Sequence, residues 1–77
     1  MTKIVLGIES TAHTAGVGII NSNGKILSNQ RSMYIPKEGG IHPREAARHH
    51  SDTFPVLFEK AFDEANLEPS DISLVSY

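Results

Sequence analysis

The residues with the clearest chemical potential stand between two apolar runs near the start of the chain. Ile4–Ile8 is one run and Ala15–Ile20 is the other, and the residues that join them are short and mostly polar. Hydroxyl and free backbone N–H groups in such a turn can bind a phosphate, and a carboxylate at a strand end can hold a magnesium-bound water. The candidate phosphate-contacting residues are Glu9, Ser10, Thr11, His13, Thr14 and Gly16. The same pattern also suits a plain hairpin turn, with the carboxylate in a structural role.

Two glycines and a histidine favour the binding interpretation. Gly16 and Gly18 are two residues apart, so they share one face of a strand, and their missing side chains let another group approach the backbone. His13 could donate to an oxyanion or pack against a base. Ser10 has no neighbouring base in a recognisable nucleophile arrangement. The turn is therefore a candidate for binding rather than for reaction, beside the interpretation as a plain hairpin, and we predict no catalytic residue in this chain.

The other histidines do not form a recognisable metal site. Glu45 and His49 lie four residues apart on a predicted helix, which supplies two potential ligands on one face. His49 and His50 are adjacent, so they point about 100° apart. Two ligands do not complete a site, and the His-Glu-x-x-His pattern is absent. We predict no metal site here; the alternative is an ion pair on the helix flank, with His50 packed at the sheet edge.

These residues are positioned by three predicted strands that form an antiparallel meander. The strands are expected over residues 3–9, 14–21 and 25–34. The first is apolar almost throughout, which indicates burial on both faces. The Asn21–Gly24 segment is a strong hairpin signal because Asn-Gly tolerates positive φ, and the third strand becomes polar quickly, as edge strands do. Short connections of this kind join neighbouring strands.

A long helix is predicted from Pro43 to Asn66, after a loop rich in proline and glycine. Proline suits the first helical position, and Asn66 suits a left-handed stop. Pro55 is expected to kink the helix without ending it, because the apolar stripe keeps its phase. That stripe comprises Ala47, His50, Phe54, Leu57, Phe58, Ala61 and Ala65. Residues 70–77 then form a fourth strand, which the crossover helix places parallel to the first.

Length and composition set the scale of the fold. With 77 residues the chain makes at most one small domain, and one helix covers only one face of a four-stranded sheet. We therefore expect residues 1–77 to be a single partial domain whose bare face is covered by a partner, a second copy, or the rest of a longer protein. The net charge of −2 gives no basic field to attract nucleic acid. There is no cysteine and no apolar run of about 20 residues, so we expect a cytoplasmic protein.

Three segments resemble a known family. Gly7–Ile19, which contains the candidate turn, is similar to the first motif of the universal tRNA threonylcarbamoyl transferases. Gly39–His50 resembles the second block of that family, a Gly/Pro loop that leads into a helix, and Leu74–Tyr77 resembles the start of its next strand. These enzymes are the catalytic subunits of the archaeal and eukaryotic KEOPS complex, with bacterial and mitochondrial relatives. The Ala12–Thr14 turn is closer to the archaeal and eukaryotic branch.

The resemblance implies a fold and a function. The fold is expected to be the start of the amino-terminal lobe of an actin, hexokinase and heat-shock ATPase-like protein, with the Ser10–Thr14 turn facing a phosphate. The full-length enzymes transfer a threonylcarbamoyl group from its adenylate to the adenosine next to the anticodon in tRNA. They use iron or zinc and an ATP-type nucleotide. Their His-x-x-x-His metal motif is absent here, so we expect the chain alone to be inactive.

The same resemblance implies partners. In the KEOPS complex the small dimerising subunit packs on amino-terminal helices of this lobe, and a kinase subunit and tRNA join the assembly. The exposed side of the helix is then a candidate partner surface, with Arg44, Arg48 and Glu59 as its charged residues. Two alternatives stay open. One is an autonomous binding module that forms a homodimer or binds a partner subunit, and the other is a lobe of a sugar-kinase-like enzyme.

Overall fold

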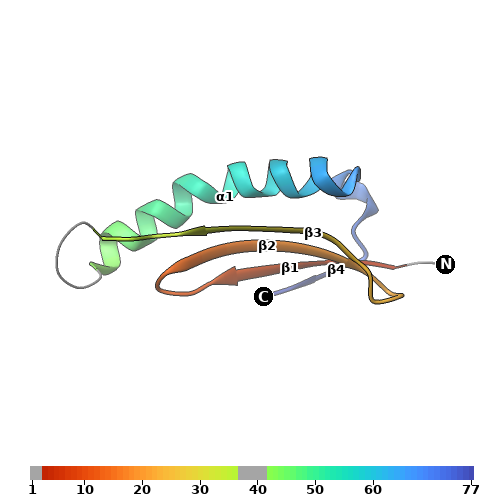
Figure 1. The fold of residues 1–77 in the computed structure, drawn as a ribbon, viewed down its shortest axis with the longest axis horizontal. Coiled ribbons are helices and arrows are strands. Elements are labelled where there is room, and N and C mark those ends of the chain that lie inside the picture. Colours follow the sequence, from red (N-terminus) through yellow and green to blue (C-terminus); the bar gives the residue numbers. More distant parts are fainter. Residues whose placement is uncertain (1–2, 37–41) are drawn as a thin grey trace.

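A computed structural model describes residues 3–36 and 42–77 and shows one four-stranded sheet crossed by one long helix (Figure 1). The strand order is β3-β2-β1-β4. In chain order the elements are β1 (Ile4–Ser10), β2 (Thr14–Asn21), β3 (Ile26–Met33), α1 (Pro43–Ala65), the 3-10 turn η1 (Pro69–Asp71) and β4 (Leu74–Ser76). The predicted α/β arrangement is confirmed.

The strand pairing also confirms the predicted meander and crossover. β1 pairs antiparallel with β2, and β2 pairs antiparallel with β3. β4 lies at the sheet edge, parallel to β1, with Leu74 opposite Val5. The fourth strand is shorter than the predicted range 70–77, because Pro69 opens η1, where Asp71 Oδ2 accepts the Glu68 N–H at 2.8 Å and the Glu68 carbonyl accepts the Asp71 N–H at 2.9 Å. Those bonds hold the chain in a turn for several residues before β4 begins.

The β2–β3 hairpin turns at Asn21–Gly24 as predicted, but of the Asn23-Gly24 pair only Gly24 has a positive φ. Asn21 Oδ1 accepts the backbone N–H groups of Asn23 and Lys25, each at 3.0 Å. Gly24 has a φ of 86°, a conformation that residues with a side chain rarely adopt. Local hydrogen bonds and one glycine therefore fix this hairpin.

α1 begins at Pro43 and continues through Pro55 to Ala65. Figure 1 shows the helix axis changing direction about midway, in the stretch that contains Pro55. A bend is expected there because proline has no N–H for the helical hydrogen bond. Asn66 is left-handed, with φ 56° and ψ 44°, and the Leu67 N–H donates to the Phe62 carbonyl at 3.1 Å. The predicted helix stop is therefore confirmed.

The core lies between α1 and the side of the sheet that faces it. It consists of Leu6, Ala15, Val17, Ile19, Leu57 and Ala61. The predicted apolar stripe is wrong at its first residue, because Ala47 is exposed and Ala46 is buried in its place. Two steps of four residues back from Phe54 pass through His50 and reach Ala46, so the helical phase selects Ala46.

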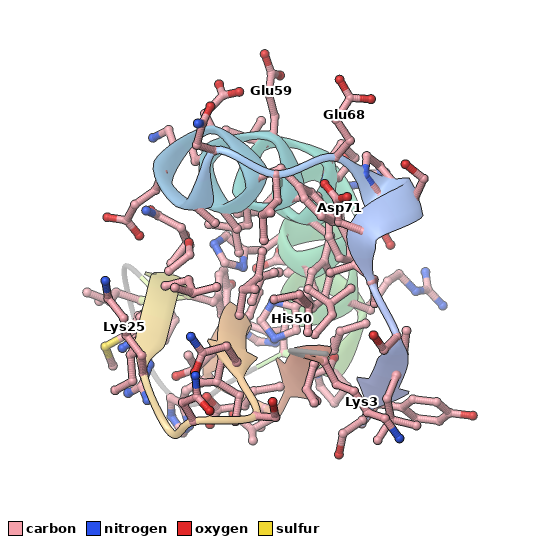
Figure 2. All side chains as sticks on the ribbon, turned by 90° about the vertical axis from the view of Figure 1, so that its right-hand side faces the viewer. Lys3, Lys25, His50, Glu59, Glu68 and Asp71 are labelled. Carbon is pink, nitrogen blue, oxygen red and sulfur yellow. The ribbon has the colours of Figure 1, made fainter. Side chains whose placement is uncertain are left out.

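No element among the described residues covers the opposite side of the sheet, which we call the open face. Figures 1 and 2 show α1 on one side only. Side chains alternate along a strand, so residues next to buried ones point to the open face. It carries four exposed large apolar side chains, Ile20, Ile26, Met33 and Leu74. The expectation of a bare face is confirmed for residues 3–36 and 42–77.

The isolated chain is expected to associate or to bind a hydrophobic dye through the open face. Ile26, Ile20 and Leu74 lie in one row across the sheet, and exposed apolar surface of this kind is normally covered in soluble proteins. Ile26→Lys together with Met33→Lys should lower the dye signal and favour the monomer. Val56→Lys is the control, because Val56 is also exposed (47%) but lies on α1. Dye fluorescence and sedimentation measure both effects, and a native chain that is monomeric and silent to the dye contradicts the expectation.

The Glu64 side chain connects α1 to the edge strand β3 by hydrogen bonds. Its Oε1 accepts the Asn29 backbone N–H at 3.1 Å and the Gln30 side-chain amide at 3.2 Å. The Ser28 hydroxyl, followed by the Asn29 N–H, lowers the pKa of Glu64 below its ordinary value of 4.5. Ser28 Oγ nevertheless has no partner that meets hydrogen-bond geometry within the described residues. The bonds from Asn29 and Gln30 therefore join α1 to β3.

Glu64→Gln is expected to remove a pH-dependent part of the stability. A carboxyl whose pKa is lower in the folded chain stabilises the fold above its unfolded pKa, and that stabilisation is lost as the pH falls through the folded pKa. The difference in free energy of unfolding between the native chain and the variant should thus be constant above about pH 5 and shrink at lower pH. Urea titrations across this range measure it, with Glu59→Gln on exposed helix surface as the control. A difference that does not change with pH would be inconsistent with this role.

Candidate functional site

The candidate phosphate turn joins β1 to β2 and is closed by its own threonines. The Thr11 N–H donates to the Thr14 carbonyl at 3.0 Å, and the Thr14 N–H donates to Thr11 Oγ1 at 3.1 Å. The Thr11 hydroxyl also lies 3.4 Å from the Thr14 carbonyl. These contacts occupy Thr11 inside the turn. The N–H groups of Ala12 and His13 donate to no group in the described part of the chain, so they are the backbone donors available to a ligand.

Two contacts hold the turn against the rest of the fold. His50 Nε2 lies 2.6 Å from the Thr11 carbonyl, and the Tyr34 N–H donates to the His13 carbonyl at 2.6 Å. His50 is buried, as predicted, and comes from the first half of α1, but it contacts the turn between the two inner strands and not an edge strand. A cavity of about 290 Å³ separates the turn from the start of α1, lined by Ser10, Thr11, Ala12, Pro43, Ala46, Ala47 and His50. The turn is thus backed by the helix.

The two adjacent histidines meet, which the sequence did not predict. Their Cβ atoms follow the helical angle, but rotation of the side chains brings His49 Nδ1 to 2.8 Å from His50 Nδ1. His49 Nε2 lies 3.1 Å from Ser32 Oγ. Within residues 3–36 and 42–77 no three side chains of metal-ligating type gather into a group.

The predicted ion pair between Glu45 and His49 is wrong. Glu45 Oε2 instead accepts the Tyr34 hydroxyl at 2.8 Å. That bond, together with burial and the negative charge of Glu45, raises the pKa of Tyr34 above 10.0. Glu45 therefore joins α1 to the residue that follows β3. The same residue, Tyr34, bonds the β1–β2 turn through its backbone N–H.

On the open face, Gly16 lies in a cross-strand row between Glu9 and Arg31. A Cβ atom at Gly16 would be 3.2 Å from Glu9 Oε2 and 3.6 Å from Arg31 Cγ. The carboxylate of Glu9 therefore leans over the glycine. At Gly18 the nearest atom to an added Cβ would be the Ser28 carbonyl at 3.7 Å, an ordinary contact. Of these two glycines, Gly16 is the one at which neighbouring atoms would crowd an added Cβ.

The structure brings the six phosphate-turn candidates together at one end of the sheet. Glu9, Ser10, Thr11 and His13 are exposed, whereas Thr14 is half-buried and Gly16 is buried. Sequence reasoning missed two residues that act on this site, Arg31 and the backing residue His50. The strand register places Arg31 opposite Gly16. The alternation of side chains along β3 was the sequence signal that could have placed Arg31 on this face. Contact with phosphate stays a prediction.

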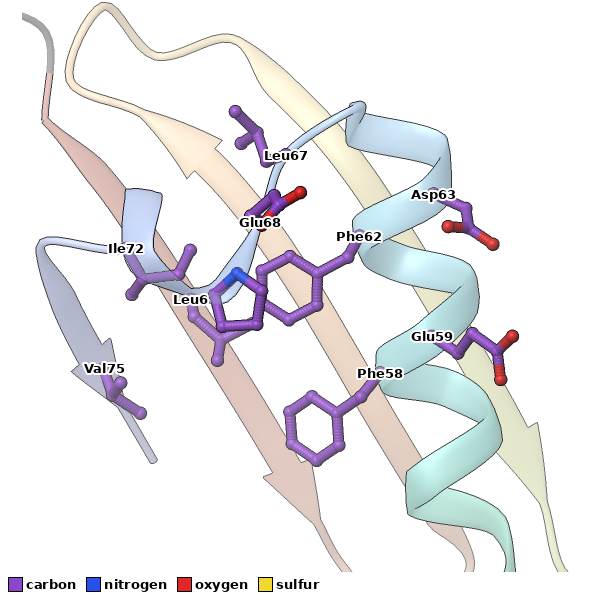
Figure 3. A pocket seen from close by; sticks show the side chains of 10 residues that line it. Leu6, Phe58, Glu59, Phe62, Asp63, Leu67, Glu68, Ile72 and Val75 are labelled. Atoms are coloured by element: carbon purple, nitrogen blue, oxygen red, sulfur yellow. The ribbon is translucent and has the colours of Figure 1, made fainter.

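A second depression, of about 710 Å³, lies between the second half of α1 and the segment that leads into β4 (Figure 3). Its lining is mostly apolar, with three carboxylates, and comprises Leu6, Phe58, Glu59, Phe62, Asp63, Leu67, Glu68, Pro69, Ile72 and Val75. Figure 3 shows the phenyl rings of Phe58 and Phe62 extending from α1 over the sheet. Of the partner-surface candidates, Glu59 borders this depression, while Arg44 and Arg48 are exposed on the first half of α1.

Fold and turn together define a class. An antiparallel meander followed by a crossover helix and a strand parallel to the first is the arrangement of an actin-like ATPase lobe fragment, and a polar β1–β2 turn lies at its end. Residues 25–77 match the model of the family described as tRNA N6-adenosine threonylcarbamoyltransferase (TsaD). The chain belongs to this family, as the resemblance had indicated.

Relatives extend the match over nearly the whole chain. It is 58% identical over 73 residues to the tRNA N6-adenosine threonylcarbamoyltransferase of Ignicoccus hospitalis, covering 95% of this chain and 22% of that protein. The enzyme of the same name from Methanopyrus kandleri is 53% identical over 75 residues, 96% of this chain and 22% of that protein. A probable bifunctional tRNA threonylcarbamoyladenosine biosynthesis protein from Thermoplasma volcanium is 51% identical over 74 residues, 96% of this chain and 14% of that protein.

The chain therefore spans about a fifth of the length of the first two of these relatives, each covered to 22%. In the parts that the structure describes, α1 included, no helix has the length and apolar character needed to cross a membrane.

Proposed function

We propose that this chain is the amino-terminal segment of a cytoplasmic enzyme that transfers a threonylcarbamoyl group from its adenylate to the adenosine next to the anticodon in tRNA. Family membership and the match to the first 22% of named transferases support this assignment. The single observation that carries it is the identity of 58% across a segment that includes the whole β1–β2 turn. The family match also favours a transferase over the sugar-kinase alternative.

Within such an enzyme the segment supplies the first phosphate-facing turn. The N–H groups of Ala12 and His13, which donate to no group in the described part of the chain, can donate to phosphate oxygens. Glu9, exposed at the end of β1, can hold a magnesium-bound water. The iron or zinc implied by the resemblance finds no group of three ligands among the described residues, so no step of the reaction is assigned to a metal here.

The proposed partners follow the exposed side of α1. Arg44, Arg48 and Glu59 are exposed charged residues on that helix, and we assign to them the contact with the small dimerising KEOPS subunit. The kinase subunit and tRNA would bind the complete enzyme. A specific observation favours a second candidate function, a self-associating module: the open face exposes Ile26 at 67% and Leu74 at 60%.

A graft tests the main proposal. The matched 73 residues of the Ignicoccus hospitalis enzyme are replaced by those of this chain, and modified adenosine in tRNA is measured by nucleoside mass spectrometry. We expect the graft to keep activity, and this chain alone, with tRNA and the adenylate, to show none. An inactive graft that is folded, or activity of the 77-residue chain alone, would contradict the assignment.

A further inference from the structure

A continuous series of hydrogen bonds runs from β3 through α1 to the β1–β2 turn. Ser32 Oγ lies 3.1 Å from His49 Nε2, His49 Nδ1 lies 2.8 Å from His50 Nδ1, and His50 Nε2 lies 2.6 Å from the Thr11 carbonyl. We call these four residues the histidine relay. It joins residues 39 positions apart in the sequence, and it ends on the candidate phosphate turn.

The relay has one arrangement of protons when both imidazole rings are neutral. The Thr11 carbonyl only accepts, so His50 Nε2 must carry a proton and donate it. Neutral His50 then has an accepting Nδ1, which requires His49 to donate from its own Nδ1. His49 Nε2 is left as an acceptor for the Ser32 hydroxyl. The partner at each step therefore fixes the tautomer of the next ring.

Holding the Thr11 carbonyl also orients the donor that follows it. The described peptide bonds include no cis bond, and in a trans peptide the C=O and the following N–H point in opposite directions. Because the Thr11 carbonyl points at His50, the Ala12 N–H points away from α1. That N–H donates to no group in the described part of the chain. The relay thus presents a free backbone donor on the outer side of the turn.

We propose that His50 is a positioning residue for ligand binding: through its bond to the Thr11 carbonyl it aims the Ala12 N–H at a phosphate oxygen, and His49 and Ser32 keep it in the donating tautomer. This inference rests on the proposed function, because it takes the ligand of the turn to be the phosphate of a nucleotide or adenylate. It assigns His50 no contact with the ligand and no proton transfer.

The first experiment compares His50→Leu with His50→Gln in the grafted enzyme. The glutamine amide nitrogen reaches about as far as Nε2 and can still donate to the Thr11 carbonyl, whereas leucine cannot. We expect leucine to raise KM for the adenylate about 10-fold, the scale of one hydrogen bond to a charged group, with a smaller change in kcat. Glutamine should recover most of that loss. His42→Leu is the control, because the His42 side chain is exposed and makes no capping hydrogen bond.

Several outcomes would overturn the proposal. If both His50 variants lose affinity equally while their thermal midpoints stay equal, packing rather than the bond matters. If neither variant changes KM, His50 does not position the turn. An Ala12 amide resonance with the same chemical shift in the leucine and glutamine variants would also contradict the proposal.

A second readout separates this inference from the proposed function. The tautomers are measured by NMR in a graft labelled with ¹⁵N-histidine. We expect the Nε2–H tautomer for His50 and the Nδ1–H tautomer for His49. Each resonance is assigned by its loss in a variant that lacks that histidine. A graft that is folded but inactive contradicts the proposed function. The tautomers of His49 and His50 can still be measured in that graft, so they test the histidine relay independently. Finding His50 in the Nδ1–H form would overturn it.

Discussion

Ile19→Ala is expected to unfold a large fraction of the isolated chain. Ile19 is 0% exposed on the central strand β2, opposite Leu6 of β1 and Ser28 of β3. Removing three buried carbons costs the transfer free energy and leaves a cavity, about 2–5 kcal/mol for isoleucine to alanine. A domain of this length is stable by roughly 4–12 kcal/mol at 0.05–0.15 kcal/mol per residue, and the open face places this chain near the lower end.

Urea unfolding followed by circular dichroism measures this change. We expect the midpoint to fall steeply with little change in slope, since the surface exposed on unfolding is nearly the same. Val56→Ala provides the matched control, because Val56 is 47% exposed on the outer side of α1. Similar losses in the two variants would show that the core does not lie where the structure places it.

Gly16→Val is expected to impair nucleotide binding by the grafted enzyme by about 10-fold or more, the scale of one displaced charged contact. The new Cβ would lie 3.2 Å from Glu9 Oε2, which is tighter than an ordinary contact. The valine methyls add to this crowding between Glu9 and Arg31. The Glu9 carboxylate must therefore move from the end of β1, where the proposal uses it for a magnesium-bound water.

The stability cost of the same substitution should be smaller. Glu9 is exposed, and its flexible carboxylate can move into solvent, so we expect less than about 1 kcal/mol. Binding of a magnesium nucleotide by calorimetry and unfolding by urea measure the two effects in parallel. Gly18→Ala is the control, since its Cβ would meet nothing closer than the Ser28 carbonyl at 3.7 Å. A loss of stability larger than the loss of affinity would favour a packing role for Gly16.

Local signals explain why most of the architecture was predictable. The Asn21 side chain bonds residues two and four positions ahead, Pro43 opens α1, and Asn66 ends it. Each of these signals depends on residues close together in the chain, so the turn or helix end can be predicted from the local sequence. The strand order followed from short connections and one crossover. The predicted stripe of α1 included Ala47, whereas the structure buries Ala46. The two residues are adjacent and identical, so only the packing of the helix on the sheet distinguishes them.

The sequence alone determined the family, the order of elements and the six candidate residues of the turn, because these depend on local residue types and motifs. Only the tertiary structure placed Arg31 beside Gly16 and His50 behind Thr11. Those contacts depend on strand register and on side-chain rotation between segments far apart in the chain. Residue spacing within one segment cannot predict such contacts, and the histidine relay exists because α1 packs against the β1–β2 turn.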